Sequence, residues 1–291
     1  MVLPLEAIAA MGGIGCMAWP RACNGASYAR ASLKGACKMT HGLFEWVDVA
    51  VPDLDAGIAF YSAVFGWDAQ PVAEGPVGYV MFHKDGQLAA GMSLLGADSE
   101  VPASWTSYVS VDDVGVIAAR AAELGGDVII PPMDVSDAGR MTYLRDPQGA
   151  SLGFWEAGTH TGADDFNRPG FLTWNGLGSR DVLGSKAFYS ALMPEWVFHD
   201  SGTDEAPFWM IKLGDRDNAG LGALSDEFSP DTPTHWRVFF VVDDARTSLG
   251  VVEANGGQAI GPVVDSGFGP VVRVADPFGA AFLIIGPMVV S

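Results

Sequence analysis

Two kinds of apolar spacing alternate along the chain, and residues 44–67 show both. Apolar residues occupy every second position of residues 46–51, which predicts a half-buried strand. Asp53 follows, and its side chain can accept a hydrogen bond from the free N–H groups at the start of a helix. Apolar residues then recur at helical spacing until Gly66, which predicts a helix with one face packed on a sheet.

The same pattern returns about 130 residues later, at residues 174–196, and both copies contain Phe-Tyr-Ser-Ala. Three further segments recur in the same order: residues 105–113 as 236–244, residues 125–126 as 256–257, and residues 146–150 as 276–280. The chain is therefore two homologous halves. Each half divides again, because residues 106–126 repeat the plan of residues 46–67.

We expect an α+β fold made of four related units, each a strand, a helix and further strands. In the first half the expected strands are residues 46–51, 79–83, 89–95, 105–111, 128–130, 141–145 and 151–156, with helices after Asp53 and over residues 114–124. The expected organisation is a leader (1–42), a first domain (43–157), a linker (158–169), a second domain (170–287) and a tail (288–291).

The leader differs from the rest of the chain. It holds all three cysteines, so no disulfide joins parts of the two halves. Its apolar segment, residues 7–19, is too short to span a bilayer and lacks the basic start of a secretory signal. One interpretation is that translation starts at Met39, which makes the protein cytoplasmic; a targeting leader that exports it is the alternative.

The formal net charge of −19 bears on the partners. An acidic protein repels phosphate backbones and anionic lipid headgroups, so we expect neither a nucleic-acid nor a membrane partner. The expected partner is a small molecule.

Four such units in two pairs resemble the vicinal oxygen chelate superfamily, which includes glyoxalase I, bleomycin resistance proteins and extradiol dioxygenases. Residues 53–67, 111–113, 125–126 and 146–149 carry the likeness, and the second half repeats most of them. Residues 46–48, 137–141, 160–163 and 174–175 make the chain most similar to tandem two-domain glyoxalase-like or hydroxylase-like proteins of actinobacteria. The resemblance implies two domains, each with paired βαβββ units that form a half-barrel sheet with a cleft.

Metal-dependent members of this superfamily place His or Glu at four cleft positions of each site. The resemblance maps these positions onto Trp46, Met92, Thr106 and Gly153 in the first half, and onto Trp174, Leu221, Arg237 and Leu283 in the second. Indole, thioether and aliphatic groups are poor ligands for hard divalent ions, and arginine repels them. We therefore expect no metal cofactor.

Asp48 is the candidate catalytic group, because it shares a strand face with Trp46 and would lie beside Trp155 in the cleft. Burial there would raise its pKa and suit it to general acid or base catalysis. The alternative is a structural aspartate bonded to an amide or an arginine. Arg140 would overhang the cleft and bind an anionic group, or else pair with Asp134 or Asp137 on the surface.

The first cleft is the better candidate, because Gly176 and Pro270 replace Asp48 and Arg140 in the second half. The full set of candidate ligand-binding residues is Trp46, Met92, Thr106, Tyr108, Arg140, Trp155, Trp174 and Arg237. We expect a protein that binds a small amphipathic molecule without chemistry. The alternatives are a glyoxalase-like lyase or hydroxylase-like enzyme, and an interaction protein with an acidic surface. The tandem halves predict a monomer that imitates a dimer.

Overall fold

The computed structural model describes residues 40–72, 78–96, 99, 101–224, 228–229 and 231–287. The first half contains β1 (Phe44–Val51), α2 (Leu54–Phe65), β2 (Asp68–Pro71), β3 (Tyr79–Lys84), β4 (Gln87–Leu94), β5 (Ser104–Ser110), α3 (Val114–Glu123), β6 (Asp127–Val135), β7 (Gly139–Arg145) and β8 (Ser151–Ala157). Each strand and helix expected for this half is present. The short edge strand β2 was not expected from the sequence, since it is mostly exposed and has no apolar alternation.

The second half repeats this order. It contains β9 (Leu172–Ser179), α4 (Val182–Leu192), β10 (Val197–Asp200), β11 (Phe208–Leu213), β12 (Arg216–Ala223), β13 (His235–Val241), α5 (Ala245–Ala254), β14 (Gln258–Ala259), β15 (Val264–Asp265), β16 (Pro270–Ala275) and β17 (Ala281–Ile285). An aspartate caps the N-terminus of each helix in the described part of the chain: Asp53 for α2, Asp113 for α3, Asp181 for α4 and Asp244 for α5. Each carboxylate accepts backbone N–H groups that the first helical turn leaves free.

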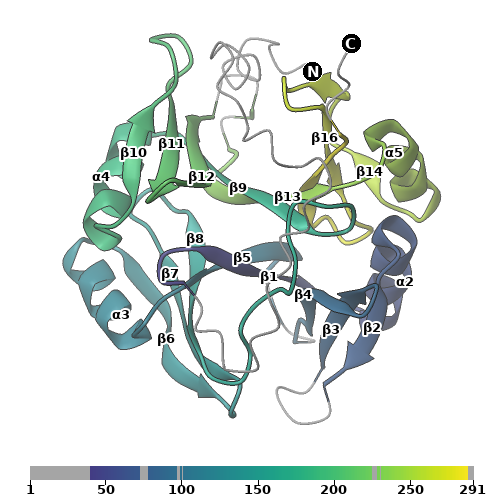
Figure 1. The fold of residues 1–291 in the computed structure, drawn as a ribbon, viewed down its shortest axis with the longest axis horizontal. Coiled ribbons are helices and arrows are strands. Elements are labelled where there is room, and N and C mark those ends of the chain that lie inside the picture. The colour runs from purple at the N-terminus through teal and green to yellow at the C-terminus, as the bar shows by residue number, and fades with distance from the viewer. Residues whose placement is uncertain are drawn as a thin grey trace.

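Strand pairing stays within each half. The eight-stranded sheet has the order β2-β3-β4-β1-β5-β8-β7-β6, and the nine-stranded sheet has the order β10-β11-β12-β9-β13-β17-β16-β14, with β15 on β16. In each sheet the two units join at the centre through an antiparallel pair, β1 with β5 and β9 with β13. Figure 1 shows both sheets curled, their outer strands bending away from the other sheet. Two tandem domains of this kind make the predicted α+β fold.

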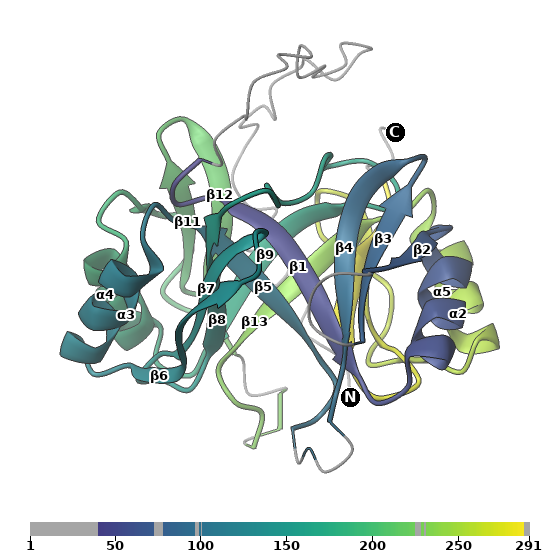
Figure 2. The ribbon, with the colours of Figure 1, turned by 90° about the horizontal axis from the view of Figure 1, so that it is seen from below.

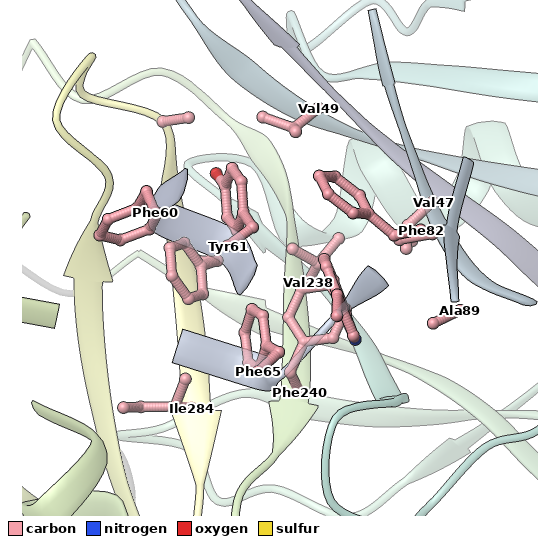
Figure 3. Close-up of a cluster of buried hydrophobic side chains, with 14 of the residues drawn as sticks. Val47, Val49, Phe60, Tyr61, Phe65, Phe82, Ala89, Val238, Phe240 and Ile284 are labelled. Carbon is pink, nitrogen blue, oxygen red and sulfur yellow. The ribbon is translucent and has the colours of Figure 1, made fainter. Parts of the chain in front are cut away.

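Side-chain packing, in contrast, crosses between the halves. Figure 3 shows one buried cluster in which Val47 and Tyr61 of the first half lie among Phe240 and Ile284 of the second. A second cluster likewise joins Phe154 to Leu221. We call the face of each sheet that meets these clusters its packed face, and the opposite face its open face. Burying one such aromatic side chain contributes about 2–3 kcal/mol, so the shared cores hold the halves together.

The helices also meet across the halves. Helix α2 contacts α5 on one side of the molecule, and α3 contacts α4 on the other. Figures 1 and 2 show the two pairs flanking the central strands. Trp105 of β5 and Trp236 of β13 pack against these helices and donate hydrogen bonds to the hydroxyls of Tyr61 and Tyr189.

Each half also forms a hydrogen bond to the segment that leads into the first strand of the other half. The indole N–H of Trp67 donates to the carbonyl of Gly170, ahead of β9, and Trp196 donates to the carbonyl of Gly42, ahead of β1, both at 2.8 Å. Residues 40–42 therefore pack on the second half, although the sequence analysis placed them in the leader. Residues 1–39 of that leader and the tail at 288–291 lie outside the described residues. Among the described residues, no helix is long and apolar enough to cross a membrane.

Candidate functional site

The register of the central strands decides which side chains reach the open face of the first sheet. Asp48 on β1 lies opposite Gly91 on β4 and Thr106 on β5. Residues that pair across strands share a face, so all three belong to the open face. The same alternation places Trp46, Tyr79, Tyr108, Tyr143, Gly153 and Trp155 on this face.

Asp48 is the centre of a hydrogen-bonded group on this face. The hydroxyl of Tyr79 donates to its Oδ2 at 3.0 Å, and the hydroxyl of Tyr108 donates to the same atom at 3.2 Å. The indole N–H of Trp46 in turn donates to the oxygen of Tyr79 at 3.2 Å. Two glycines make room for the phenol rings, since a Cβ at Gly91 or Gly153 would strike Tyr79 or Tyr108.

Burial governs the protonation of Asp48, which is only 8% exposed. Desolvation raises its pKa from 3.8 to about 6, against the hydrogen bonds from Tyr79 and Tyr108, which favour the charged form. Burial and the nearby Asp48 carboxylate also raise the pKa of both phenols, which keeps them as donors. At neutral pH the group therefore holds a largely ionised carboxylate that can accept further hydrogen bonds.

The linker supplies one wall of the same face. It follows the rim of the sheet, because Ala163 donates to the carbonyl of Glu45 and Asp164 to the carbonyl of Leu88. His160 lies edge-on against the rings of Trp46 and Trp155, with centroids 4.5 and 5.5 Å away. The carbonyl of His160 accepts the indole N–H of Trp155 at 3.0 Å.

The imidazole of His160 is held neutral. Burial lowers its pKa to about 4, although Asp164 acts in the opposite direction. Its Nε2 is buried and has no hydrogen-bond partner within the described residues. His160 therefore carries one unused, buried polar atom beside two indoles.

Two of the predicted ligand-binding residues do not reach the open face. Met92 pairs with Val49 and is fully buried in the packed core, where its sulfur lies against Gly57. The prediction was wrong by one position, since Gly91 is the residue that faces Asp48. Leu221, its counterpart in the second half, lies in the core for the same reason, opposite Leu177.

Arg140 also points away from the open face. Its neighbour Met141 pairs with Trp155 on that face, so alternation turns Arg140 to the other side of β7. There it forms ion pairs of 3.1 Å with Asp134 and with Glu156. Arg140 therefore forms a surface ion pair with Asp134, as the alternative interpretation expected. The expectation that it overhangs the cleft was wrong.

The structure thus brings five of the predicted residues together on the first sheet: Trp46, Asp48, Thr106, Tyr108 and Trp155. It places Trp174 and Arg237 on the open face of the other sheet, beside Gly176. The sequence analysis missed Tyr79 and His160. Tyr79 could have been found, because Tyr79 and Met81 alternate with the buried Val80 and Phe82 along β3.

The donors on the first open face do not fit a divalent metal ion. Asp48 is its one central carboxylate, and two phenols already donate to it. Of the four positions mapped from the superfamily, Trp46, Thr106 and Gly153 lie on this face, and none of them provides an imidazole or a carboxylate. Within the described residues, His, Cys, Asp and Glu form no group of three or more that could hold a metal ion.

Comparisons with known proteins agree on one family. Residues 43–154 match the family described as the Glyoxalase/Bleomycin resistance protein/Dioxygenase superfamily. A protein of Mycobacterium bovis, provisionally named glyoxylase CFP32, is 35% identical over 253 residues, which cover 84% of this chain and 95% of that protein. The anthracycline biosynthesis protein DauV of Streptomyces sp. (strain C5) is 32% identical over 261 residues, covering 82% and 91%.

Solved structures with the same fold are more distant in sequence. The Mn(II)-bound glyoxalase from Novosphingobium aromaticivorans gives a TM-score of 0.58 at 15% identity, covering 85% of this chain and 83% of that one. The 2,3-dioxygenase LapB from Pseudomonas sp. KL28 gives 0.56 at 16% identity, covering 85% and 94%. These two likenesses concern the fold alone.

Proposed function

Because the chain belongs to the glyoxalase/bleomycin resistance protein/dioxygenase superfamily, we propose that it binds a small amphipathic molecule on the open face of its first sheet, without the metal ion of the metal-dependent members. The observation that carries the proposal is Asp48 held by Tyr79 and Tyr108 beside the indole of Trp46. Binding sites for small molecules combine an apolar surface with a few fixed polar groups, and this face offers both.

The polar groups indicate what the ligand carries. The two phenol protons are already donated to Asp48, so the group presents mainly acceptors: the carboxylate and the phenol oxygens. The neutral His160 adds either a donor or an acceptor at Nε2. A flat, largely apolar ligand with a hydroxyl or amino group directed at Asp48 fits this set.

The names of two relatives agree with such a ligand. DauV and DnrV of Streptomyces are named for anthracycline biosynthesis, and anthracyclines are planar aromatic molecules with hydroxyl and amino groups. We propose a ligand of this general chemistry for this chain. Metal independence is supported by the donor chemistry of Asp48 and its neighbours, so a chelator should leave ligand binding unchanged.

Native mass spectrometry and elemental analysis of protein purified from its own host identify any copurifying ligand and any metal. The ligand is then titrated by tryptophan fluorescence. Trp46→Ala and Asp48→Ala should each weaken binding by about 1–3 kcal/mol, the range for losing a stacking or hydrogen-bonding group. Trp174→Ala on the other sheet is the matched control and should leave this affinity nearly unchanged. If Trp174→Ala loses binding while Trp46→Ala binds normally, the ligand does not bind on the open face of the first sheet.

A second candidate function is catalysis by a glyoxalase-like lyase or hydroxylase-like enzyme. The pKa of Asp48, about 6, favours it, because a general base works best when its pKa lies near the operating pH. Turnover of a methylglyoxal–thiol adduct that resists a chelator and disappears in Asp48→Asn would support this function. Tight ligand binding without turnover supports the binding protein.

A further inference from the structure

The open face of the second sheet carries the opposite chemistry from that of the first. The register of β9 and β13 pairs Gly176 with Arg237 and Trp174 with Phe239. Arg273 on β16 pairs with Leu283 on β17, and Leu283 pairs with Phe239 on β13. Arg273 therefore lies on the same face. The polar groups gathered here are the guanidiniums of Arg237 and Arg273, the indole N–H of Trp174 and the neutral imidazole of His235, and none of them is an acid.

The two faces can be compared position by position, because the registers match. Gly176 lies opposite Gly220 and Arg237, as Asp48 lies opposite Gly91 and Thr106. The two phenols that donate to Asp48 are also replaced: Phe208 stands for Tyr79 and Phe239 for Tyr108. The carboxylate and both of its hydroxyl donors are therefore lost together, and arginines take the places of Thr106 and Tyr143.

Neither arginine has an acidic partner among the described residues. The Nε of Arg237 is buried and makes no hydrogen bond there. Burial lowers the pKa of Arg237 to about 10, and the charge of Arg273 acts in the same direction. The guanidinium of Arg273 lies 5.5 Å from the ring of Phe228. Acidic residues outnumber basic ones by 35 to 16 in this chain, so two unpaired arginines on one face are unexpected for a merely solvated surface.

Gly176 leaves room for a side-chain carbon between two donor groups and a phenyl ring. A Cβ built there would meet Cε2 of Phe239 at 3.5 Å, Nη2 of Arg237 at 3.7 Å and Nε1 of Trp174 at 3.9 Å, all ordinary contact distances. The indole N–H of Trp174 makes no hydrogen bond within the described residues, whereas that of Trp46 donates to Tyr79. The position that holds a side-chain carboxylate in the first half has no side chain in the second, although a Cβ would fit there without a clash.

We propose that the open face of the second sheet is a separate binding site for an aromatic carboxylate, whose carboxylate group lies above Gly176 and accepts hydrogen bonds from Arg237 and Trp174. The ligand supplies the acid that the first half provides as Asp48. Its ring lies against Phe208 and Phe239, which line the same face. Arg273 adds a second positive charge. A planar guanidinium suits this task because it binds a carboxylate through two parallel hydrogen bonds.

The test compares 1-naphthoate with 1-naphthamide, which has the same ring system without the charge, by isothermal titration calorimetry on the full chain. Naphthoate should bind at least about tenfold more tightly than the amide. Gly176→Asp should weaken naphthoate binding at least about tenfold, because the new carboxylate occupies the site and pairs with Arg237. Arg237→Gln should weaken it to a similar degree.

Arg145→Gln is the matched control. It removes one positive charge from a half-exposed arginine that pairs with Asp127 on the first sheet, so naphthoate affinity should stay within about twofold. Melting temperatures show whether each variant folds, and Gly176→Asp should melt no lower than the parent chain. If Gly176→Asp does not fold, Arg237→Gln decides alone. Equal binding of naphthoate and naphthamide, or unchanged naphthoate binding in a folded Arg237→Gln, overturns the proposal.

Discussion

The hydroxyl of Tyr61 donates a hydrogen bond of 2.9 Å to Oδ2 of Asp276, which is 215 residues away in the other half. Both residues belong to repeated motifs, and their counterparts Tyr189 and Asp146 face each other across the other junction, close enough to affect each other's pKa. The other oxygen of Asp276 accepts the backbone N–H groups of Phe278 and Ala280 and so fixes its own turn. One aspartate thus joins a turn of its own half to a helix of the other.

Removing this hydroxyl should destabilise the whole molecule. Tyr61→Phe leaves Oδ2 of the buried Asp276 without its donor, which should cost about 1–3 kcal/mol of unfolding free energy. Urea unfolding followed by circular dichroism measures the loss. Tyr143→Phe is a control that removes a hydroxyl away from the junction and should cost less. An unchanged urea midpoint for Tyr61→Phe would show that the bond contributes nothing.

The stability of the protein should depend on pH through Asp48. Its pKa is about 6 in the folded state and 3.8 when unperturbed, so the folded state binds more protons between these values. The contribution of Asp48 to stability should therefore fall as pH rises from about 4 to about 6, by up to about 3 kcal/mol, while the buried His160 and His235, whose pKa values are lowered to about 4, act in the opposite direction. Asp48→Asn removes this titration, so the unfolding free energy of the parent chain minus that of Asp48→Asn should fall over the same interval. A parallel pair of curves would contradict the assignment.

Much of the fold follows from the sequence because several signals agree. Asp caps, helical apolar spacing and the internal repeat all indicate the same units. The site was harder to predict. Residues 89–92 of β4 are small or apolar on both faces, and without alternation the register of Met92 could not be fixed. The contact of His160 with Trp46 joins a linker to a distant strand, and no local pattern encodes such a contact.

The leader should be dispensable, although residues 40–42 are not. A chain that starts at Met39 keeps the Gly42 carbonyl that accepts hydrogen bonds from Trp196 and Asn218. Its melting temperature should match that of the full chain. A chain that starts at Leu43 loses both bonds and should melt several degrees lower, about 1–2 kcal/mol in free energy. A large loss in the first truncation would show that residues 1–38 pack on the body.

The protein should be monomeric. Its two halves already bury their packed faces against each other, as the mixed clusters around Tyr61 and Phe154 show. Light scattering at micromolar concentration should give about 31 kDa, in line with the chain mass of 30.6 kDa. A value near 61 kDa would contradict this.

The linker that carries His160 is the one connecting segment that a duplicated domain does not repeat. Duplication of a domain yields two copies of every strand and helix, but fusing the copies creates a single connecting segment. Here that segment contacts Trp46 and Trp155 of the first half, so the connection itself makes the two halves unequal. The first half could specialise around His160, which the linker supplies to it and not to the second half. The other half carries arginines where the first has Thr106 and Tyr143, so one repeated unit presents two faces of opposite charge.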